Sequence, residues 1–222
     1  KKLYFNSLTK RVRKFERAAW KEFDLLLPIT EKDAYQVQRL EDVKHILVTP
    51  FSIELENIPK SENERWVGYH IGAMDWIANR TGMEWFLSKA WPRIHKAMPK
   101  FEFYFAGRGM SSQFRKMKIK GVHCLSEVPN AAEFIADKKI LIVPLWSGGG
   151  VRVKILEAMA AGVPLTCSNI PPHMEIVGDT VLTFDPSSED ELEESLERIT
   201  TDSSLRERSA QSAQARAREF TW

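Results

Sequence analysis

The chain of 222 residues is 43% hydrophobic and 28% charged, close to the composition of ordinary globular domains. A disordered tail is therefore excluded, and so is a spanning helix, since no apolar run approaches the roughly 20 residues that cross a bilayer. The net charge is only +2, but residues 1–23 carry eight Lys or Arg against two Glu. Cys124 and Cys167 fall in predicted buried strands, which favours reduced thiols in a cytosolic protein over a disulfide.

Residues 3–23 predict an amphipathic helix, because apolar residues recur there at helical spacing: Leu8, Val12, Phe15, Ala19 and Phe23. Its cationic side has two interpretations. In the commoner arrangement it is the solvated face of a helix that packs on its own protein. In the other it faces anionic lipid head groups.

The next segment predicts two short strands around a capped helix. Residues 25–28 and 45–49 are apolar runs of strand type, the first of them expected to be buried. Thr30 is expected to cap the helix between them, with Asp33 at the fourth position of the capping box. Residues 51–64 combine Ser, Asn and Pro with little periodicity and predict an interdomain linker.

From residue 65 on, strands alternate with helices. Apolar, often β-branched runs predict strands at residues 65–72, 101–106, 120–125, 139–145, 163–167 and 180–184. Helices are predicted at residues 79–98, 131–138 and 151–160, from Ser187 or Ser188 onward, and at 203–220. This alternation predicts an α/β fold, a Rossmann-like parallel sheet with helices on both faces.

Prolines modify two of these elements. Pro92 lies inside the helix at residues 79–98, so we expect a kink or two helices there. Pro171-Pro172 predicts a turn after the fifth strand. The stripe in the first long helix is expected in the core rather than as an aromatic binding platform: Trp85, Phe86, Ala90, Trp91 and Ile94.

The chain is organised around residues 144–164, which predict a strand, a glycine loop, a helix and a turn. The three glycines of residues 148–150 let an anion approach the backbone, and the start of the next helix favours negative charge. Arg152 and Lys154 add two positive charges at the same end. The pattern predicts a phosphate or diphosphate site. Glu157, on an otherwise apolar helix, would need hydrogen bonds such as those of sugar hydroxyls.

This stretch resembles the donor-binding motif of retaining glycosyltransferases of family 4 (glycosyl transferases group 1), in the variant G-x-R-x-K-x-L-E-A-M-A-x-G-x-P. Residues 101–107 resemble the family's strand ending in a glycine, and residues 167–177 resemble its segment ending in E-I-V. The common family motif has two Glu separated by seven residues. Here Gly149 stands at the first of those positions and Glu157 at the second, the ribose-binding one.

The resemblance implies the GT-B architecture of two Rossmann-like domains, of which the C-terminal one holds a nucleoside diphosphate sugar. Residues 1–50 would be the tail of the N-terminal acceptor domain, residues 51–64 the linker, residues 65–202 the nucleotide-sugar-binding domain and residues 203–222 a C-terminal helix. On this reading these residues alone have no transferase activity, because most of the acceptor domain is absent from them.

The implied reaction transfers a hexose to a hydroxyl acceptor, a saccharide or lipid-linked saccharide, in glycan or polysaccharide synthesis. It implies retention of configuration, no metal, and no cofactor besides the donor substrate. We expect a cytoplasmic protein, with peripheral contact to the inner face of the membrane through the basic helix as a further expectation. Nucleic acid is not an expected partner.

The resemblance also assigns roles to residues. Arg152 and Lys154 are the catalytic candidates, because they would stabilise the leaving diphosphate. The alternative for these two is ordinary solvent-exposed helix charge. Donor contacts are implied for Gly72, Met74, Gly107, Arg108, Glu127, Val128, Ser147, Gly148, Gly149, Gly150, Val151 and Glu157.

Two other function classes remain open from the residues. Residues 107–112 follow a strand, and Glu127 lies 20 residues beyond Gly107, which mimics the dinucleotide fingerprint of an NAD-dependent oxidoreductase. However, Ser112 replaces the third glycine, and the preceding strand is not the first of its domain. The chain could also be a non-catalytic nucleotide-binding domain.

Overall fold

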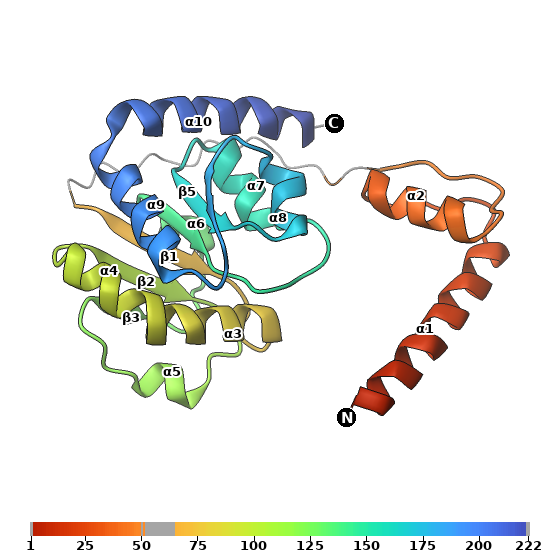
Figure 1. The fold of residues 1–222 in the computed structure, drawn as a ribbon, viewed down its shortest axis with the longest axis horizontal. Coiled ribbons are helices and arrows are strands. Elements are labelled where there is room, and N and C mark those ends of the chain that lie inside the picture. Colours follow the sequence, from red (N-terminus) through yellow and green to blue (C-terminus); the bar gives the residue numbers. More distant parts are fainter. Residues whose placement is uncertain (1, 50, 52–64, 221–222) are drawn as a thin grey trace. The chain divides into compact units, whose positions relative to one another are not determined.

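The structure, a computed structural model, describes residues 2–49, 51 and 65–220 (Figure 1). The chain divides into two compact units, Lys1–Ser52 and Ile53–Trp222. Apart from Phe51, the predicted linker at residues 51–64 lies outside the described residues. The assignment of the first unit to an acceptor domain stays a prediction.

The first unit contains the two predicted helices, α1 (Lys2–Glu22) and α2 (Glu31–Leu40). Thr30 caps α2 as predicted, because its hydroxyl oxygen accepts a hydrogen bond from the Asp33 N–H at 3.0 Å. Glu41, which follows α2, forms ion pairs with Lys21 and Arg17 of α1. These hydrogen-bonded cations lower the pKa of the Glu41 carboxyl.

One expectation for this unit is wrong. The predicted strands at residues 25–28 and 45–49 form only one isolated parallel bridge, between Leu26 and Ile46. Leu25 and Leu27 are exposed, because no further strand of the described chain extends this pair. The amphipathic helix α1 is confirmed. Both interpretations of its cationic side stay open, since its large apolar side chains are exposed in the described part of the chain: Tyr4, Phe5, Leu8, Val12 and Phe15.

The second unit is built on a six-stranded parallel sheet in the order β3-β2-β1-β4-β5-β6. Its strands are β1 (Val67–Ile71), β2 (Glu102–Ala106), β3 (Val122–Cys124), β4 (Ile140–Val143), β5 (Leu165–Ser168) and β6 (Leu182–Phe184). All residues of β4 and β5 are buried, as expected for strands covered on both faces. The predicted Rossmann-like fold is confirmed.

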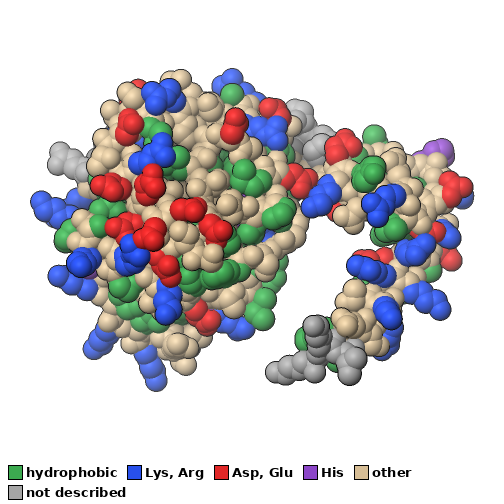
Figure 2. Space-filling model, viewed as in Figure 1, with side chains coloured by type: hydrophobic (Ala, Val, Ile, Leu, Met, Phe, Trp, Pro, Cys, Tyr) green, Lys and Arg blue, Asp and Glu red, His purple; other side chains and the backbone are tan. Residues whose placement is uncertain are grey.

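One face of the sheet is covered by α3 (Ile77–Trp85), α4 (Trp91–Ala97) and α9 (Glu189–Thr201). Their apolar side chains and those of the sheet form one core cluster, in which Trp91, Phe86 and Phe103 are fully buried. The predicted core stripe is therefore confirmed. The first turn of α9 contains three acidic residues, and acidic side chains gather in this region of the surface in Figure 2.

The helix predicted at residues 79–98 is interrupted, as its proline indicated. A π-helical segment, Phe86–Ala90, separates α3 from α4, and Pro92 stands in the first turn of α4. Proline is tolerated there because the N–H groups of a first turn have no intrahelical partner. The Trp91 indole N–H donates to the Lys120 carbonyl at 3.0 Å and so ties α4 to the segment before β3.

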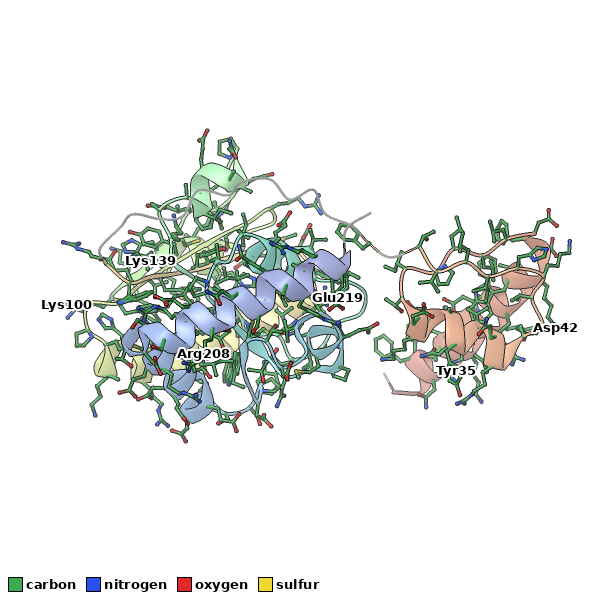
Figure 3. All side chains as sticks on the ribbon, turned by 90° about the horizontal axis from the view of Figure 1, so that it is seen from above. Tyr35, Asp42, Lys100, Lys139, Arg208 and Glu219 are labelled. Carbon is green, nitrogen blue, oxygen red and sulfur yellow. The ribbon has the colours of Figure 1, made fainter. Side chains whose placement is uncertain are left out.

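The other face carries α6 (Ala131–Ile135), α7 (Val153–Ala160) and α10 (Ser203–Ala217), which ends in a 3-10 turn, Arg218–Phe220. Helix α10, on which Figure 3 labels Arg208, packs against α7, and the labelled Glu219 lies in the 3-10 turn that follows. Gly162 ends α7 with φ +66°, a conformation that favours glycine.

Three local expectations need correction. Residues Pro171–Val177 form a helix, α8, rather than a turn, because prolines at the first positions suit a helix start. The short helix α5 (Ser112–Lys116) was not predicted; Ser111 caps it. Cys167 is buried, whereas Cys124 is only partly buried because β3 is an edge strand. Both cysteines are free, as expected.

Candidate functional site

The carboxyl ends of β1 and β4 lie side by side at the centre of the sheet, where the strand order reverses. The chain continues from β1 toward β2 on one side and from β4 toward β5 on the other. The loops that follow, residues 72–76 and 144–152, therefore diverge from a common point. In open α/β sheets ligands bind in the crevice at this position.

Backbone hydrogen bonds join the loops after β1, β2 and β3. The Met74 N–H donates to the Arg108 carbonyl at 2.7 Å, and the Gly107 N–H donates to the Ser126 carbonyl at 2.7 Å. A Cβ built on Gly107 would lie only 1.8 Å from the Gly72 carbonyl oxygen. Glycine at this position therefore permits the first two loops to lie in contact at the carboxyl edge of the sheet.

The glycine loop covers Arg152. A Cβ built on Gly148 would lie 1.5 Å from Arg152 Nη2, so only glycine lets the guanidinium fold under the loop. Arg152 is 4% exposed, and its guanidinium lies 4.4 Å from the centre of the Trp76 ring. Its Nε and Nη2 have no hydrogen-bond partner in the described part of the chain. Gly149 and Gly150 have no atoms near their Cβ positions and present open backbone.

Lys154 reaches from the first turn of α7 to the end of β1 and the start of α3. Its Nζ lies 3.2 Å from His70 Nε2 and 3.5 Å from Asn79 Oδ1. A Cβ built on Gly72 would lie 2.7 Å from the same Nζ, so this glycine makes room for the ammonium. The lysine therefore connects helices from both faces of the sheet at its carboxyl edge.

Two buried histidines flank the cations. His70 Nδ1 lies 2.9 Å from the Ile142 carbonyl, and His173 Nδ1 lies 2.8 Å from the Ser168 carbonyl. A carbonyl only accepts, so Nδ1 carries the proton in both rings and Nε2 is an acceptor. Nε2 of His173 has no partner among the described residues.

These groups influence one another's protonation. Desolvation, with the Arg152 charge as the second cause, lowers the pKa of Lys154 to about 7. Desolvation also lowers the pKa of His173 to about 4 and that of His70 well below its ordinary value, and nearby positive charges add to both shifts. Burial lowers the pKa of the Arg152 guanidinium. Both imidazoles are therefore neutral near pH 7, and the positive charge belongs to Arg152 and Lys154.

Glu157 is exposed, so its carboxylate is accessible to solvent. It therefore does not need the hydrogen bonds that a buried carboxylate on an apolar helix would require. Partial desolvation nevertheless raises the pKa of its carboxyl. The pKa of the Tyr69 hydroxyl is raised by burial and also by the Glu157 charge, which places Glu157 near β1.

The other predicted donor contacts divide into three groups. Ser147 is exposed beside the glycine loop, and Val151 is partly buried next to Arg152. Met74 has its side chain in the core, and Arg108 is exposed and pairs with Asp75 at 3.5 Å. Glu127 and Val128 lie after β3, at the edge of the sheet, connected to the crevice through the neighbouring Ser126 carbonyl.

Sequence reasoning missed His70, Asn79, His173 and Trp76. His70, Asn79 and Trp76 take part through contacts with residues far apart in the sequence; His70 and Lys154, for example, are 84 positions apart. A polar residue in an apolar run was the one available signal, at His70 within β1.

No group of three His, Cys, Asp or Glu side chains is arranged to hold a metal ion in the part of the chain that the structure describes. Within residues 2–49, 51 and 65–220, none of the helices combines the length and apolarity of a membrane span. The groups that the structure gathers at this site are cations and hydrogen-bonding groups. Arg152, Lys154 and the open glycine backbone favour an anion such as a diphosphate.

Comparison with known proteins agrees with this geometry. The family model described as glycosyl transferases group 1 matches residues 66–202. The chain is 26% identical over 240 residues to the O-antigen chain mannosyltransferase B of Escherichia coli, a match that covers 96% of this chain and 61% of that protein. The chain thus spans less than two thirds of this relative's length.

Solved structures share the fold at lower identity. A mutant of TarM from S. aureus, in complex with fondaparinux, alpha-GlcNAc-glycerol and UDP, matches 95% of this chain with a TM-score of 0.78 and 15% identity, over 44% of its own length. HepE from Anabaena, in complex with UDP and glucose, matches 90% of this chain with a TM-score of 0.70 and 15% identity, over 60% of its length.

Proposed function

Since the chain belongs to the glycosyl transferases group 1 family, we propose that its second unit binds a nucleoside diphosphate sugar and that the protein transfers the hexose to a hydroxyl acceptor. One observation carries the proposal. Arg152 lies under the glycine loop and Lys154 beside Gly72 in the loop after β1, and neither is paired with a carboxylate among the residues described. Buried cations without counter-ions are costly unless a ligand supplies the negative charge.

The proposed reaction breaks the bond between C1 of the sugar and the diphosphate oxygen, which takes the electron pair. The acceptor oxygen bonds to C1, and its hydroxyl proton leaves with the diphosphate. Negative charge on the diphosphate grows as the bond breaks, so the fixed charges of Arg152 and Lys154 stabilise the transition state more than the bound donor. Retention of configuration and independence of metal ions belong to the same proposal.

The relatives support the substrate class. The Escherichia coli relative is named an O-antigen chain mannosyltransferase, which supports a saccharide acceptor in polysaccharide synthesis. Two structural neighbours were solved with UDP and a sugar or sugar derivative, which supports a nucleotide-sugar donor. Glu157 is exposed, and its charge contributes to raising the pKa of Tyr69 on β1. We propose that Glu157 holds the ribose. The membrane contact of α1 and a cytoplasmic location remain proposals.

The NAD-dependent alternative is not favoured. The partial fingerprint at residues 107–112 follows β2, whereas the dinucleotide motif belongs to the turn after the first strand of its domain. Here that turn follows β1. In addition, the backbone between Gly107 and the helix α5 is occupied by contacts with the loop after β1, such as the Met74–Arg108 hydrogen bond.

The test is a thermal-shift panel of UDP, GDP, ADP, their sugar conjugates and NADH, because a ligand that binds only the folded state raises its melting temperature. We expect one nucleoside diphosphate and its sugar conjugates to stabilise the wild type, and Lys154→Met to abolish most of that shift. Lys100→Met is the matched control, since Lys100 is exposed at the end of the unit where Lys139 also lies (Figure 3). Stabilisation by NADH alone, or equal shifts in both variants, would contradict the proposal.

A further inference from the structure

We propose that His70 and Asn79 are positioning residues for Lys154: they hold its ammonium with neutral acceptors only, so that its charge stays available to the donor diphosphate. This inference rests on the proposed function and deepens it. It concerns two side chains that the motif around residues 148–157 does not contain.

The first argument is the fixed tautomer of His70. This side chain is fully buried on β1, and its Nδ1–H donates to the Ile142 carbonyl on β4. The proton is therefore committed to Nδ1, and the lone pair of Nε2 faces the Lys154 Nζ at 3.2 Å. The hydrogen bond between His70 and Ile142 spans the two central strands, so Nε2 is held at the point where the loops of the site diverge.

The second argument is the orientation of Asn79. Asn79 is 3% exposed, and its Nδ2 donates to the Ala73 carbonyl at 2.9 Å. The amide nitrogen is thereby used on the loop after β1, which leaves Oδ1 facing the Lys154 Nζ at 3.5 Å. Both acceptors of the ammonium are thus oriented by backbone groups, and neither carries a charge.

The third argument is that no carboxylate of the described elements around Lys154 pairs with its ammonium. Glu157, on the same helix, is exposed and forms no ion pair with Lys154. Arg152 lies at the start of the same helix, His70 on β1 and His173 on α8, and these are cationic or neutral. Asp75, on the loop before α3, is exposed and pairs with Arg108. Among the described residues no carboxylate forms an ion pair with Lys154.

A carboxylate in place of either acceptor would hold the lysine more tightly but would neutralise it. Neutral acceptors leave the ammonium incompletely stabilised, which agrees with its lowered pKa. A bound diphosphate would then supply the missing negative charge and favour the protonated lysine. Binding of the diphosphate should therefore depend on pH through Lys154, and the two positioning residues should set that dependence.

The experiment is calorimetric titration of the 222-residue chain between pH 6 and pH 9 with whichever of UDP, GDP and ADP gives the largest thermal shift. For the wild type we expect the affinity to fall about tenfold between pH 7 and pH 8.5, because the protonated lysine becomes scarce. Asn79→Asp keeps the size of the side chain but adds a counter-ion. It should weaken binding about tenfold at pH 7 and move the fall in affinity to higher pH.

His70 is tested by a pair of variants. His70→Leu removes the acceptor, so the affinity should fall about tenfold at pH 7 and the pH midpoint should move to lower pH. His70→Gln offers an amide oxygen to Lys154 and should restore most of the affinity and the wild-type midpoint. A purely structural role of His70 or Asn79 would weaken binding equally at every pH.

The outcomes separate the two proposals. If no nucleoside diphosphate binds the wild type, the proposed function fails and this inference with it. If the wild type binds but Asn79→Asp leaves the pH midpoint unchanged, the inference alone is overturned, whether or not His70→Leu folds. Opposite displacements of the midpoint by Asn79→Asp and His70→Leu support it.

Discussion

The two units of the chain differ in how they treat their apolar side chains. In residues 65–220 the helices and the sheet bury a continuous core that includes Trp91, Phe103 and Phe105. Among the described side chains of residues 4–49, Ala34 and Val37 alone are buried, while Phe5 and Phe15 are 59% and 75% exposed. The difference indicates that the second unit has the means to fold around its own core, whereas the first unit has little core of its own.

The candidate site follows the same division. Every residue assigned to donor binding, and every group that contacts Arg152 or Lys154, belongs to the second unit. Three glycines of the site, Gly72, Gly107 and Gly148, lie where a Cβ would contact a neighbouring group of the same unit. The account therefore predicts that stability and nucleotide binding respond to changes in the second unit and not to matched changes in the first.

The largest effect is expected in the core. Phe103→Ala should lower the free energy of unfolding by about 3–5 kcal/mol, because Phe103 is fully buried between the sheet and the helices α3 and α4. Phe15→Ala, the same change on exposed α1, should stay within about 0.5 kcal/mol of the wild type. Urea unfolding curves of both variants measure the difference, and equal losses would contradict the comparison.

The next effect concerns ligand binding. Arg152→Met should weaken binding of the preferred nucleoside diphosphate about 10- to 100-fold, the range of a lost hydrogen bond to a charged group. Arg13→Met on exposed α1 is the matched control and should bind as the wild type does. Titration calorimetry compares the two, and a loss of affinity in the Arg13 variant would mean that the first unit contributes to the site.

A smaller effect has the opposite sign. The pKa of Lys154 is lowered in the folded chain, so between about pH 7 and its ordinary value the unfolded chain binds more protons, and stability from this group rises with pH. Below pH 7 the charged, desolvated ammonium opposes folding fully. Lys154→Met should therefore raise the melting temperature of the ligand-free chain by about 2–4 °C at pH 6, the shift for roughly 1 kcal/mol in a domain of this size.

This gain should shrink as the pH approaches 10, where wild-type Lys154 is neutral in the folded chain. Differential scanning calorimetry at pH 6 and pH 10 checks the sign. A variant less stable than the wild type at pH 6 would show that the His70 and Asn79 contacts outweigh desolvation.

Glu157 should matter less than the cations because it is exposed. Glu157→Gln should weaken binding of a nucleoside diphosphate about fivefold, as expected for loss of about 1 kcal/mol from a hydroxyl contact. Binding of pyrophosphate, which has no ribose, should not change. A variant that loses both affinities equally would move Glu157 from the ribose to the phosphates.

The sequence allowed the sheet, its parallel strands and the glycine loop to be predicted, because apolar periodicity and glycine runs are local signals. Thr30, and either Ser187 or Ser188, were predicted as helix caps for the same reason. Thr30 accepts the expected backbone hydrogen bond, and Ser188 proves to be the cap of α9. The turn predicted at Pro171-Pro172 was wrong, since a proline pair is compatible both with a turn and with the start of a helix such as α8.

What the sequence did not reveal depends on contacts between distant segments. Leu25 and Phe15 are exposed because no other described residue packs over them. Apolar periodicity does not indicate whether a partner surface is present. The roles of His70 and Asn79 arise because β1 and β4 are neighbours and because Lys154 crosses the carboxyl edge of the sheet. The spacing of these residues along the chain does not indicate that Lys154 contacts His70 and Asn79.

Removal of the first unit is expected to leave the affinity for the nucleoside diphosphate unchanged. A chain that begins at Ile53 contains the whole second unit, so its affinity for the preferred nucleoside diphosphate should stay within about twofold of the 222-residue chain. Titration calorimetry measures it. A large loss in a shortened chain whose circular dichroism remains α/β would assign part of the site to the first unit.

The most direct test of the central claim is a crystal structure of the chain with its preferred nucleoside diphosphate. The account predicts that the phosphate oxygens lie within hydrogen-bond distance of the Arg152 guanidinium, the Lys154 ammonium and the backbone of residues 148–150. Phosphates bound elsewhere, with Arg152 still stacked on Trp76 and Lys154 still held only by His70 and Asn79, would contradict it.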